Sequence, residues 1–406
     1  MSDDYVCGNC FNDEAIRAFI AGIAESETCD FCGATANEPI AASLDEVIDC
    51  IARGIALHYD DPANTLPYES AEGGYQGATY TTDEVFEALD LDFPNDKDSQ
   101  LRDAIARGLD NDLWSDAEPF ALSPDEQLSF SWEEFCQVIK HQRRYFFTQY
   151  KRHEDSELFG PDQILKLIFS YARNEGAFVV LPRGTHIFRA RRQRKGMKYA
   201  SAGTLGPPPV ERAIQTNRMS PPGVVMTYAA DDIATALAET ANAPGLFAIG
   251  EFVTERDALI LDLTRLPPIP SVFAELPDSL EYDPRPRLGF LHHISREISR
   301  PIARDDRVHI EYVPTQVVTE YVRTALTIEN RAVDGIRYRS SRRRVETALV
   351  LFADRDNLIL EESEQPEFYR LAKDRWLRLV KASMKRVTAE NIRAWSKPGG
   401  GLFSDL

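Results

Sequence analysis

The sequence predicts an α+β protein with a helical front half and a mixed α/β back half. Three observations indicate this fold class. Four cysteines near the start form two close pairs, apolar residues then recur with a helical period, and short β-rich runs alternate with helices after Gly176. A chain of 406 residues with 43% apolar side chains is long enough for two or three domains with their own cores.

The first predicted element is a metal-binding module over residues 1–40. Cys7 and Cys10 form one Cys-x2-Cys pair, Cys29 and Cys32 form a second, and eighteen residues separate the pairs. Two such pairs offer four thiolates to one tetrahedral zinc ion, which is favoured over a disulfide in a reducing compartment. Because protein ligands fill all four positions, we expect structural zinc (Zn) and no catalytic metal. The alternative is four free cysteines in a helical segment.

Residues 41–175 are predicted to form an acidic helical domain. Apolar side chains follow a helical period through most of it, and Cys50 and Cys136 fall among them as core residues. The sequence Ser123-Pro124-Asp125-Glu126 is typical of a helix start. The stretch 68–82 is rich in Gly, Tyr and Ser and is typical of a loop. The helices predicted for the front half cover residues 12–26, 44–58, 83–89, 99–109 and 131–151.

The acidic charge of the chain is concentrated in its front part. Residues 1–150 hold 31 Asp and Glu against 8 Lys and Arg, whereas the remaining residues are close to neutral. Nucleic-acid binding depends on Lys and Arg contacts to phosphates, so we expect no nucleic acid as a partner of the front part. The near-neutral back half can hold an anionic small molecule.

Residues 176–360 are predicted to form a mixed α/β domain, and residues 361–406 a helical tail. Pro-rich links interrupt the pattern, and the tail begins with a basic amphipathic helix from Pro366 to about Lys385. The strands predicted for the domain lie at 178–181, 186–189, 224–228, 246–249, 258–261 and 348–352, with helices at 232–241 and 314–326.

No stretch of the sequence approaches the roughly 18 to 20 apolar residues that a bilayer crossing needs. The first residues, Met1-Ser2-Asp3-Asp4, also lack the basic and then apolar plan of a secretory signal. We therefore expect no membrane partner and a cytoplasmic location.

The segment from Asn217 to Glu239 carries the most informative polar residues. Arg218 precedes a Pro-Pro-Gly turn, an apolar strand ends at Tyr228, and an Asp-capped helix then carries Glu239 on the flank of its apolar stripe. A carboxylate in that place can stabilise positive charge on a substrate, and a solvated glutamate on a helix face is the alternative.

This segment resembles the RES domain family, whose members are bacterial enzymes that destroy NAD and usually act as toxins. Four further pieces agree with the family in the same order, and together they cover about residues 176–355: His186-Ile187-Phe188-Arg189-Ala190-Arg191, Thr235-Ala236-Leu237-Ala238-Glu239, Tyr312-Val313-Pro314-Thr315-Gln316, and Asp334-Gly335-Ile336-Arg337-Tyr338-Arg339-Ser340-Ser341. The resemblance implies an ADP-ribosyltransferase-like fold, in which a split sheet surrounds an NAD cleft.

The front part, with its paired cysteines, resembles the helical N-terminal domain that is often fused to RES domains and grouped with the HEPN superfamily. Many HEPN ribonucleases carry an Arg-x4-6-His motif. Here Arg144 and His153 are nine positions apart, so ribonuclease activity is not expected.

The resemblance also implies the site residues. Glu239, Tyr228 and Arg218 would be catalytic, with Glu239 stabilising the cationic ribose as nicotinamide departs. Arg189 would hold phosphate oxygens together with Arg218, because a guanidinium matches their geometry. The remaining substrate-binding residues would be Ser340 or its neighbour Ser341, with Asn217 beside Arg218.

Other polar residues keep two interpretations. Asn217 and Ser220 either shape the pocket or hydrogen-bond the following turn, and Gln316 is either a cap partner or a ligand. For the adjacent residues His292 and His293 we favour a non-catalytic role. For the run Arg342-Arg343-Arg344 we favour a solvated turn over a surface that attracts anionic substrate.

The predicted function is that of a toxin-like enzyme which cleaves the nicotinamide–ribose bond of NAD, as a glycohydrolase or a phosphorylase, in a toxin–antitoxin or phage-defence setting. The expected partners are NAD, inorganic phosphate as an acceptor, an antitoxin or regulatory protein, and a second copy bound through the helical domain. The alternatives are a protein ADP-ribosyltransferase and an inactive RES-fold scaffold.

Overall fold

A computed structural model describes residues 4–150, 156–277, 282–301, 307–343, 346–361 and 374–396. The chain divides into two compact units. The first unit consists of Met1–Glu126 together with Ile269–Pro286, and the second of Gln127–Pro268 together with Arg287–Leu406. A short segment from the middle of the predicted back domain therefore belongs to the first unit. The predicted domain boundaries after residues 40, 175 and 360 stay predictions.

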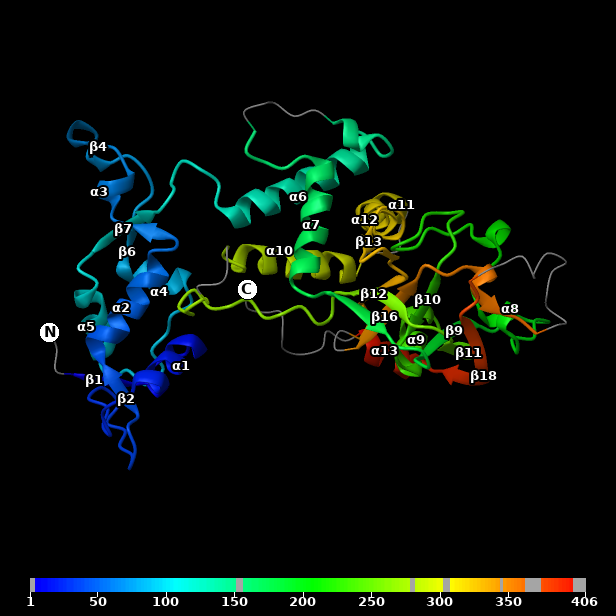
Figure 1. The fold of residues 1–406 in the computed structure, drawn as a ribbon, viewed down its shortest axis with the longest axis horizontal. Coiled ribbons are helices and arrows are strands. Elements are labelled where there is room, and N and C mark those ends of the chain that lie inside the picture. The colour runs from blue at the N-terminus through cyan, green and yellow to red at the C-terminus, as the bar shows by residue number, and fades with distance from the viewer. Residues whose placement is uncertain are drawn as a thin grey trace. The chain divides into compact units, whose positions relative to one another are not determined.

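The first unit is mainly helical, with short strands between its helices (Figure 1). Its elements are β1 (Tyr5–Cys7), the 3-10 turn Gly8–Cys10, α1 (Glu14–Ile23), β2 (Ala41–Ser43), α2 (Leu44–Ile55), β3 (Tyr59–Asp60), α3 (Pro62–Thr65), β4 (Tyr68–Glu69), the 3-10 turn Ser70–Glu72, β5 (Gly74–Tyr75), β6 (Tyr80–Thr81), α4 (Thr82–Ala88), α5 (Gln100–Gly108) and β7 (Leu113–Asp116).

Local capping explains where several of these helices begin. The Asp13 carboxylate accepts the amide N–H groups of Ala15 and Ile16 at the start of α1. Thr81 and Glu84 form a reciprocal capping box at the start of α4. The apolar faces of α1, α2, α4 and α5 then pack into one buried cluster. This cluster is the core of the first unit.

The helices predicted for the front half are confirmed, with ends that differ by a few residues. The exception is the helix predicted over 131–151: α6 spans Pro124–His141, begins at the predicted start signal, and ends ten residues early. The loop predicted over 68–82 is wrong in part, because β4, β5 and β6 lie within it. Cys50 is buried, as predicted, and Cys136 is half-buried against the core of the second unit.

The second unit carries the large sheet and the helices around it. After α6 come the 3-10 turn Phe147–Gln149, α7 (Pro161–Asn174), β8 (Phe178–Leu181), β9 (His186–Arg192), α8 (Ala202–Leu205), the 3-10 turn Val210–Arg212, β10 (Thr227–Ala230), α9 (Ile233–Thr240), β11 (Gly245–Thr254), β12 (Ala258–Asp262), α10 (Arg285–Ser299), α11 (Val308–Glu311), α12 (Val313–Thr324), β13 (Thr327–Ile328), β14 (Arg331–Ala332), β15 (Gly335–Arg339), β16 (Thr347–Leu351), the 3-10 turn Arg355–Asn357, β17 (Leu358–Ile359), β18 (Leu377–Val387) and α13 (Ala389–Ser396).

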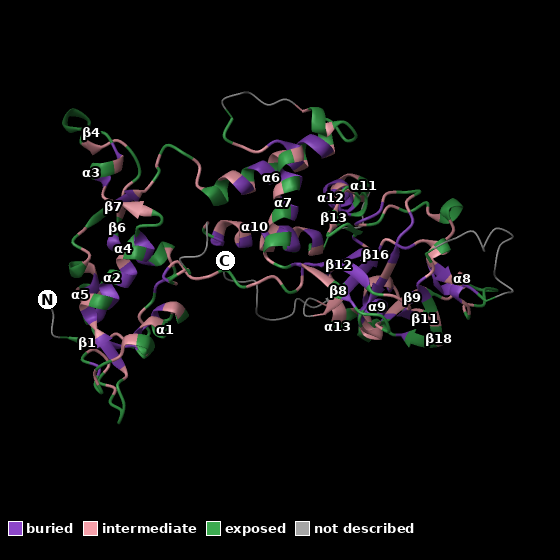
Figure 2. Ribbon diagram, in the orientation of Figure 1, coloured by how far each residue is buried: buried purple, intermediate pink, exposed green. Residues whose placement is uncertain are grey.

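Nine strands of the described chain form one sheet in the order β17-β18-β11-β9-β10-β16-β15-β12-β8. Neighbours are antiparallel except β12 with β15 and β17 with β18, which are parallel. Figure 2 shows buried residues along β12 and β16 in the interior of this sheet. Together with the helical N-terminal region, the mixed sheet confirms the predicted α+β class. The ADP-ribosyltransferase-like fold stays a prediction.

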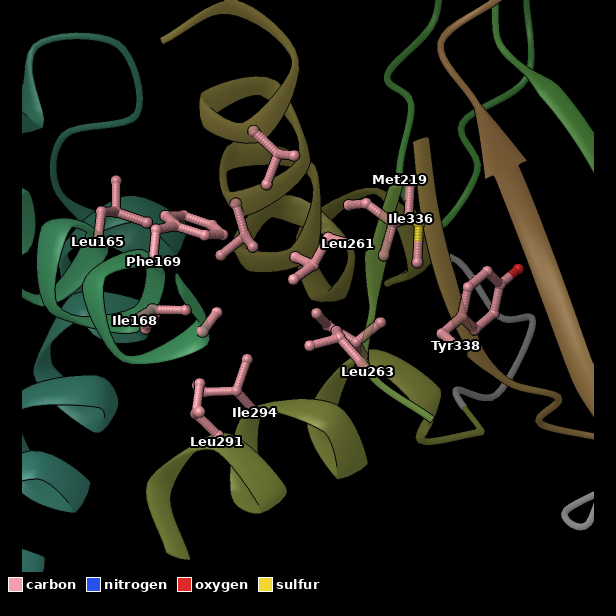
Figure 3. Packing of buried hydrophobic residues seen from close by; sticks show 14 of the residues in the cluster. Leu165, Ile168, Phe169, Met219, Leu261, Leu263, Leu291, Ile294, Ile336 and Tyr338 are labelled. Carbon is pink, nitrogen blue, oxygen red and sulfur yellow. The ribbon is translucent and has the colours of Figure 1, made fainter. Parts of the chain in front are cut away.

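A large apolar cluster joins the sheet to its helices. Leu165 and Phe169 of α7 and Leu291 of α10 point toward Leu261 of β12 (Figure 3). Tyr338 of β15 lies at the margin of this cluster in the same view. The core therefore supports the strands that carry the predicted site residues.

The amphipathic helix predicted from 366 to about 385 is wrong for the residues that the structure describes. Residues 377–387 form strand β18, which pairs with β11 along Gly245–Thr254, and residues 366–373 lie outside the described residues. Trp376 and Leu379 suit a helical period, whereas Leu377 and Leu379 suit the period of two of a strand. The antiparallel partner decides between them, and it lies more than a hundred residues away.

The strands predicted for the back domain are confirmed as β8, β9, β10, β11, β12 and β16. The run predicted over 224–228 is displaced, because β10 begins at Thr227 and continues through Ala230. The Pro221-Pro222-Gly223 turn delays the entry into the sheet: Gly223 adopts a positive φ of 87° and donates back to Ala213.

Candidate active site

The sheet opens between β9 and β10, where the predicted site begins. Both strands are fully described, and they pair through a single residue pair, Ala230 with Phe188. On its other side, β9 pairs with β11 over seven residues. The Arg189 side chain bridges the opening, and its Nη1 donates to the carbonyl oxygen of Tyr228 at 2.8 Å. A guanidinium thus replaces the backbone pairing that would otherwise continue.

Arg189 is desolvated in this place. Its Nε atom is buried and has no hydrogen-bond partner among the described residues. Burial, and secondarily the nearby charge of Arg191, lowers the pKa of Arg189 to about 9. The side chain remains a cation at neutral pH with an unused donor, as an anion-binding arginine requires.

Helix α9 follows β10 directly and carries Glu239 in its last turn. The Asp232 side chain caps the helix by accepting the Thr235 amide, and it also accepts from Arg343 Nη1 at 2.9 Å. Ala236 and Leu237 pack on small buried residues of the sheet, including Ala190 and Ala230. The short side chains allow the helix to lie close to the strands that carry Arg189 and Tyr228.

Glu239 is half-buried and has a specific partner. The Ser340 hydroxyl donates to Glu239 Oε1 at 2.5 Å. Ser340 is 1% exposed, and its oxygen accepts the amide N–H groups of Arg342 and Arg343. Both lone-pair directions of the hydroxyl are therefore used, which commits its proton to Glu239. This does not fit a solvated glutamate on a helix face.

Arg218 lies on the loop that precedes β10. Its Nη1 donates to the carbonyl oxygen of Ile298 at 2.8 Å, and its guanidinium lies 5.5 Å from the centre of the Tyr312 ring. Thr315 fixes the backbone of the loop by donating to the Arg218 carbonyl. Tyr312 and Thr315, which belong to the motif Tyr312-Val313-Pro314-Thr315-Gln316, therefore position this arginine.

The Tyr228 hydroxyl anchors the same loop. It accepts the Met219 amide at 3.3 Å and pairs with the Ser220 hydroxyl at 2.9 Å. Burial raises the pKa of Tyr228 to about 12, so the phenol stays neutral at physiological pH. Ser220 thus pairs with the tyrosine, an interpretation that the sequence did not offer.

Tyr338 is a further residue of this neighbourhood, and its place in the motif around Ser340 does not by itself predict a role. Burial raises the pKa of this phenol well above its usual value, and the charge of Glu239 raises it further. Tyr228 and Arg218 also act on it electrostatically. Tyr338 therefore lies near the groups predicted to be catalytic. The available signal was its place on β15, two residues before Ser340 in the sequence.

The other two predicted substrate-binding residues are less closely tied to this cluster. Asn217 is exposed, and its amide donates to Gln215 and to Ser220 within its own loop. Ser341 is half-buried, and no hydrogen bond to its side chain appears among the described residues. The geometry favours Ser340 over Ser341, and both substrate-binding assignments stay predictions.

The remaining polar motifs have structural partners. Gln316 is neither cap nor free ligand, because its amide donates to Thr216 and to the Asn217 carbonyl and so holds the Arg218 loop. His292 contacts the Pro267 carbonyl at 2.8 Å. Burial lowers the pKa of His293, and that ring stacks with Phe290. Arg343 pairs with the α9 cap as described above, whereas Arg344 and His153 lie outside the described residues.

A surface pocket of about 560 Å³ lies beside the first turns of α9. Its lining includes Ile233 and Leu237 of that helix and Lys385 and Trp395 from the C-terminal elements. None of the seven predicted site residues of the second unit lines it. The candidate site is therefore the polar cluster around Glu239, which contains the carboxylate, the arginines and the phenol predicted to act on the substrate.

The four predicted metal ligands meet in the first unit. The Sγ atoms of Cys7, Cys10, Cys29 and Cys32 all lie within 4.8 Å of one another. Three of the separations are 3.9 Å, 3.5 Å and 3.7 Å. A tetrahedral zinc ion with Zn–S bonds of about 2.3 Å requires sulfurs about 3.8 Å apart. The residues present therefore fit a metal ion, and zinc itself stays a proposal.

The protonation of these thiols also suits a cation. Burial, followed by the hydrogen bond with Cys32, raises the pKa of Cys7 to about 11. The hydrogen bond with Cys29, followed by burial, raises the pKa of Cys10 well above its usual value. The pKa of Cys29 falls to about 4, because Cys10 donates to it. Four clustered sulfurs, three of them on buried cysteines, can carry four thiolates only when a cation compensates their charge.

Comparisons with known families find one domain in each half of the sequence. Residues 23–153 match the family model described as HEPN/RES N-terminal domain 1, and residues 186–374 match the RES domain. No curated protein and no solved structure matches the chain. Within the described part of the chain, no helix has both the length and the apolar composition that a bilayer crossing requires. The two family matches, in this order, show that the chain carries a HEPN/RES N-terminal domain followed by a RES domain.

Proposed function

We propose that this protein is an NAD-consuming, toxin-like enzyme that cleaves the bond between nicotinamide and ribose. The RES domain supports an NAD-related, toxin-like function at the level of the family. The observation that carries the finer proposal is the hydrogen bond from the buried Ser340 hydroxyl to Glu239 Oε1, close to Tyr338 and its electrostatic neighbours. A carboxylate held in this way is suited to a reaction that builds positive charge.

The proposed reaction begins with loss of nicotinamide. As the bond from ribose C1′ to the pyridine nitrogen breaks, its electron pair returns to the nitrogen and the sugar becomes an oxocarbenium ion. Ser340 donates its hydrogen bond to Oε1 of Glu239. The other carboxylate oxygen, Oε2, has no partner among the described residues, and we propose that it faces the ribose hydroxyls and the cation. The ring leaves as a neutral molecule, so no general acid is required.

The acceptor completes the reaction. Water would add its hydroxyl to C1′ and lose a proton, for which Glu239 is the nearest proposed base, to give ADP-ribose. Inorganic phosphate would add through one oxygen instead and give ADP-ribose with a phosphate at C1′. The two outcomes correspond to a glycohydrolase and a phosphorylase.

The arginines would bind the anionic part of the substrate. Arg189 is a half-buried cation whose buried Nε is an unused donor, and Arg218 is a half-buried cation held by Ile298 and Tyr312. Either can form the bidentate contacts that pyrophosphate or inorganic phosphate favours. The Tyr228 ring would lie against the nicotinamide or its ribose.

The zinc ion that we propose for Cys7, Cys10, Cys29 and Cys32 would stabilise the first unit and take no part in the reaction, since four thiolates complete a tetrahedral ion. An unrestrained NAD-consuming enzyme would harm its own cell. We therefore include in the proposal a cytoplasmic setting with an antitoxin or regulatory protein, and a homodimer formed through the helical domain.

The deciding experiment incubates the full-length protein with NAD, with and without inorganic phosphate, and measures free nicotinamide. Release without phosphate supports a glycohydrolase, and release that depends on phosphate supports a phosphorylase. ADP-ribose that becomes attached to protein would indicate transfer instead. If NAD loss is no greater than in a folded Glu239→Ala variant, the enzymatic proposal is wrong.

A further inference from the structure

A segment from the back half of the chain is part of the core of the first unit. Phe273, on the connection between β12 and α10, is 4% exposed and belongs to the buried cluster of α1 and α2. Its ring packs against the one position of α2 that has no side chain: a Cβ built on Gly54 would lie 2.4 Å from Phe273 Cδ1. Such a close approach is possible only with glycine on the helix.

Polar contacts hold both sides of this ring. The Ser271 hydroxyl donates to Asp13 Oδ2 at 2.7 Å, while Asp13 Oδ1 caps helix α1. On α2, the Cys50 thiol lies 3.7 Å from the Phe273 carbonyl oxygen. Arg53 pairs with Glu275 at 3.3 Å, but both side chains are exposed, so that ion pair contributes little.

The segment is also folded on itself. Arg285, which is 9% exposed, donates through Nε to the Ser271 carbonyl and through Nη2 to the Ala274 carbonyl. Its Nη1 pairs with Asp283 at 2.9 Å. One buried guanidinium therefore closes the turn that presents Phe273, and less conformational entropy is lost when the turn docks.

We infer that the first unit is a receptor for the β12–α10 connection of the RES domain. Its binding surface, which we call the Phe273 socket, consists of Asp13, Cys50, Arg53 and Gly54, and its partner is an aromatic turn of the same chain. The first unit thus holds a turn that lies, in the sequence, within the residues matched by the RES domain. This inference does not depend on the reaction proposed above.

The socket connects two functional regions of the chain. Asp13 follows Cys10 of the metal cluster by three residues, so loosening the cluster loosens the Ser271 acceptor. At the other end, the segment leads into α10, whose Ile298 carbonyl accepts from Arg218.

The test measures alkylation of Cys50 in the full-length protein by mass spectrometry of its peptide. Cys50 is 2% exposed and lies beneath the docked turn, so its rate reports the undocked population. We expect Phe273→Ala to raise the rate at least about 30-fold, given the usual cost of a Phe-to-Ala truncation in a core. Gly54→Ala should also raise it, because the new methyl group displaces the ring.

The matched control is Gly22→Ala on helix α1, where an added Cβ meets nothing within 4 Å. The rate of Cys50 alkylation in this variant should equal that of the wild type. In the double variant Gly54→Ala with Phe273→Ala, the increase in rate should be smaller than the product of the two single increases, because both changes act on one contact. Equal rates in wild type, Phe273→Ala and Gly54→Ala would overturn the inference, as would equal rates in the two glycine variants.

A second measurement tests the link to the metal cluster and does not depend on a folded core variant. Incubation with a zinc chelator should accelerate alkylation of Cys50, and Ser271→Ala should do so to a smaller extent. Circular dichroism would confirm that helix content is retained. An unchanged Cys50 rate after chelation would overturn the link between the cluster and the socket.

Discussion

The Ser340 hydroxyl donates to Glu239 Oε1 at 2.5 Å and joins the end of β15 to the last turn of α9, 101 residues earlier in the chain. Two amide N–H groups, from Arg342 and Arg343, fix the orientation of the serine. Ser340 is thus positioned to orient the carboxylate.

The first prediction concerns this pair. Ser340→Ala should lower kcat for nicotinamide release by about 10²-fold, a typical cost of removing one preorganised hydrogen-bond donor. Glu239→Gln should lower it by about 10² to 10⁴-fold. The KM for NAD should change less than kcat in Ser340→Ala, because the serine acts through the carboxylate.

Ser341→Ala is the control, since it removes the same group one residue along. Its kcat should stay within about twofold of the wild type, the scale of a surface substitution. If Ser341→Ala lost as much activity as Ser340→Ala, the assignment of Ser340 as the partner of Glu239 would be wrong.

The second prediction concerns anion binding by Arg189. ADP-ribose at about 100 times its Kd should stabilise the protein by about 2.7 kcal/mol and raise its melting temperature. Arg189→Met should abolish most of that shift, since its buried Nε lacks any other partner among the described residues. Differential scanning fluorimetry measures the shift without any turnover.

Arg192→Met serves as the control on the same strand. That arginine is exposed and donates to the Pro244 carbonyl outside the site. It should retain the full shift with ADP-ribose. A full shift in Arg189→Met would show that the phosphates bind elsewhere.

Much of the site could be predicted because its residues lie in short ordered motifs. Glu239 and Tyr228 follow a strand–cap–helix pattern that is visible in one stretch of sequence. The partners of Arg218 were not visible, because Ile298 and Tyr312 lie about 80 and 94 positions away and the first acts through its backbone carbonyl. A backbone acceptor leaves no side-chain signature.

The fold shows the same division between local and distant causes. Caps and apolar periods predicted most helices, because those signals lie within one turn of each helix end. For residues 377–385 the local sequence favours a helix, because only the pairing of β18 with β11 selects a strand. The capture of Phe273 by the first unit was invisible for a similar reason: it depends on the missing side chain at Gly54, 219 positions earlier.

The third prediction is that the purified protein contains one zinc ion per chain, measured by mass spectrometry of the metal. Cys7→Ser should lose the ion and lower the melting temperature, since structural zinc contributes directly to folding. Cys136→Ser, which changes a half-buried thiol outside the cluster, should keep it. Full zinc content in Cys7→Ser would exclude the cluster as the binding site.

The fourth prediction is a loss of stability at alkaline pH that depends on Tyr228. Its folded pKa is raised to about 12 by burial, above the usual value of about 10. Between these values the unfolded chain releases the phenol proton while the folded protein keeps it, so stability falls as pH rises from about 10 to about 12. Two pKa units correspond to at most about 2.7 kcal/mol.

Urea unfolding at pH 8, 10 and 11 tests this relation. Tyr228→Phe should lose about 0.5 to 1.5 kcal/mol at pH 8, because the hydrogen bonds to Met219 and Ser220 disappear. Between pH 10 and 11 its free energy of unfolding should then fall less than that of the wild type, because the phenol that titrates is gone. Tyr145→Phe, at a position that is 84% exposed, should follow the wild type at every pH. Parallel alkaline losses in Tyr228→Phe and the wild type would mean that this phenol titrates with its ordinary pKa, and that the Arg218 loop does not bury it in solution.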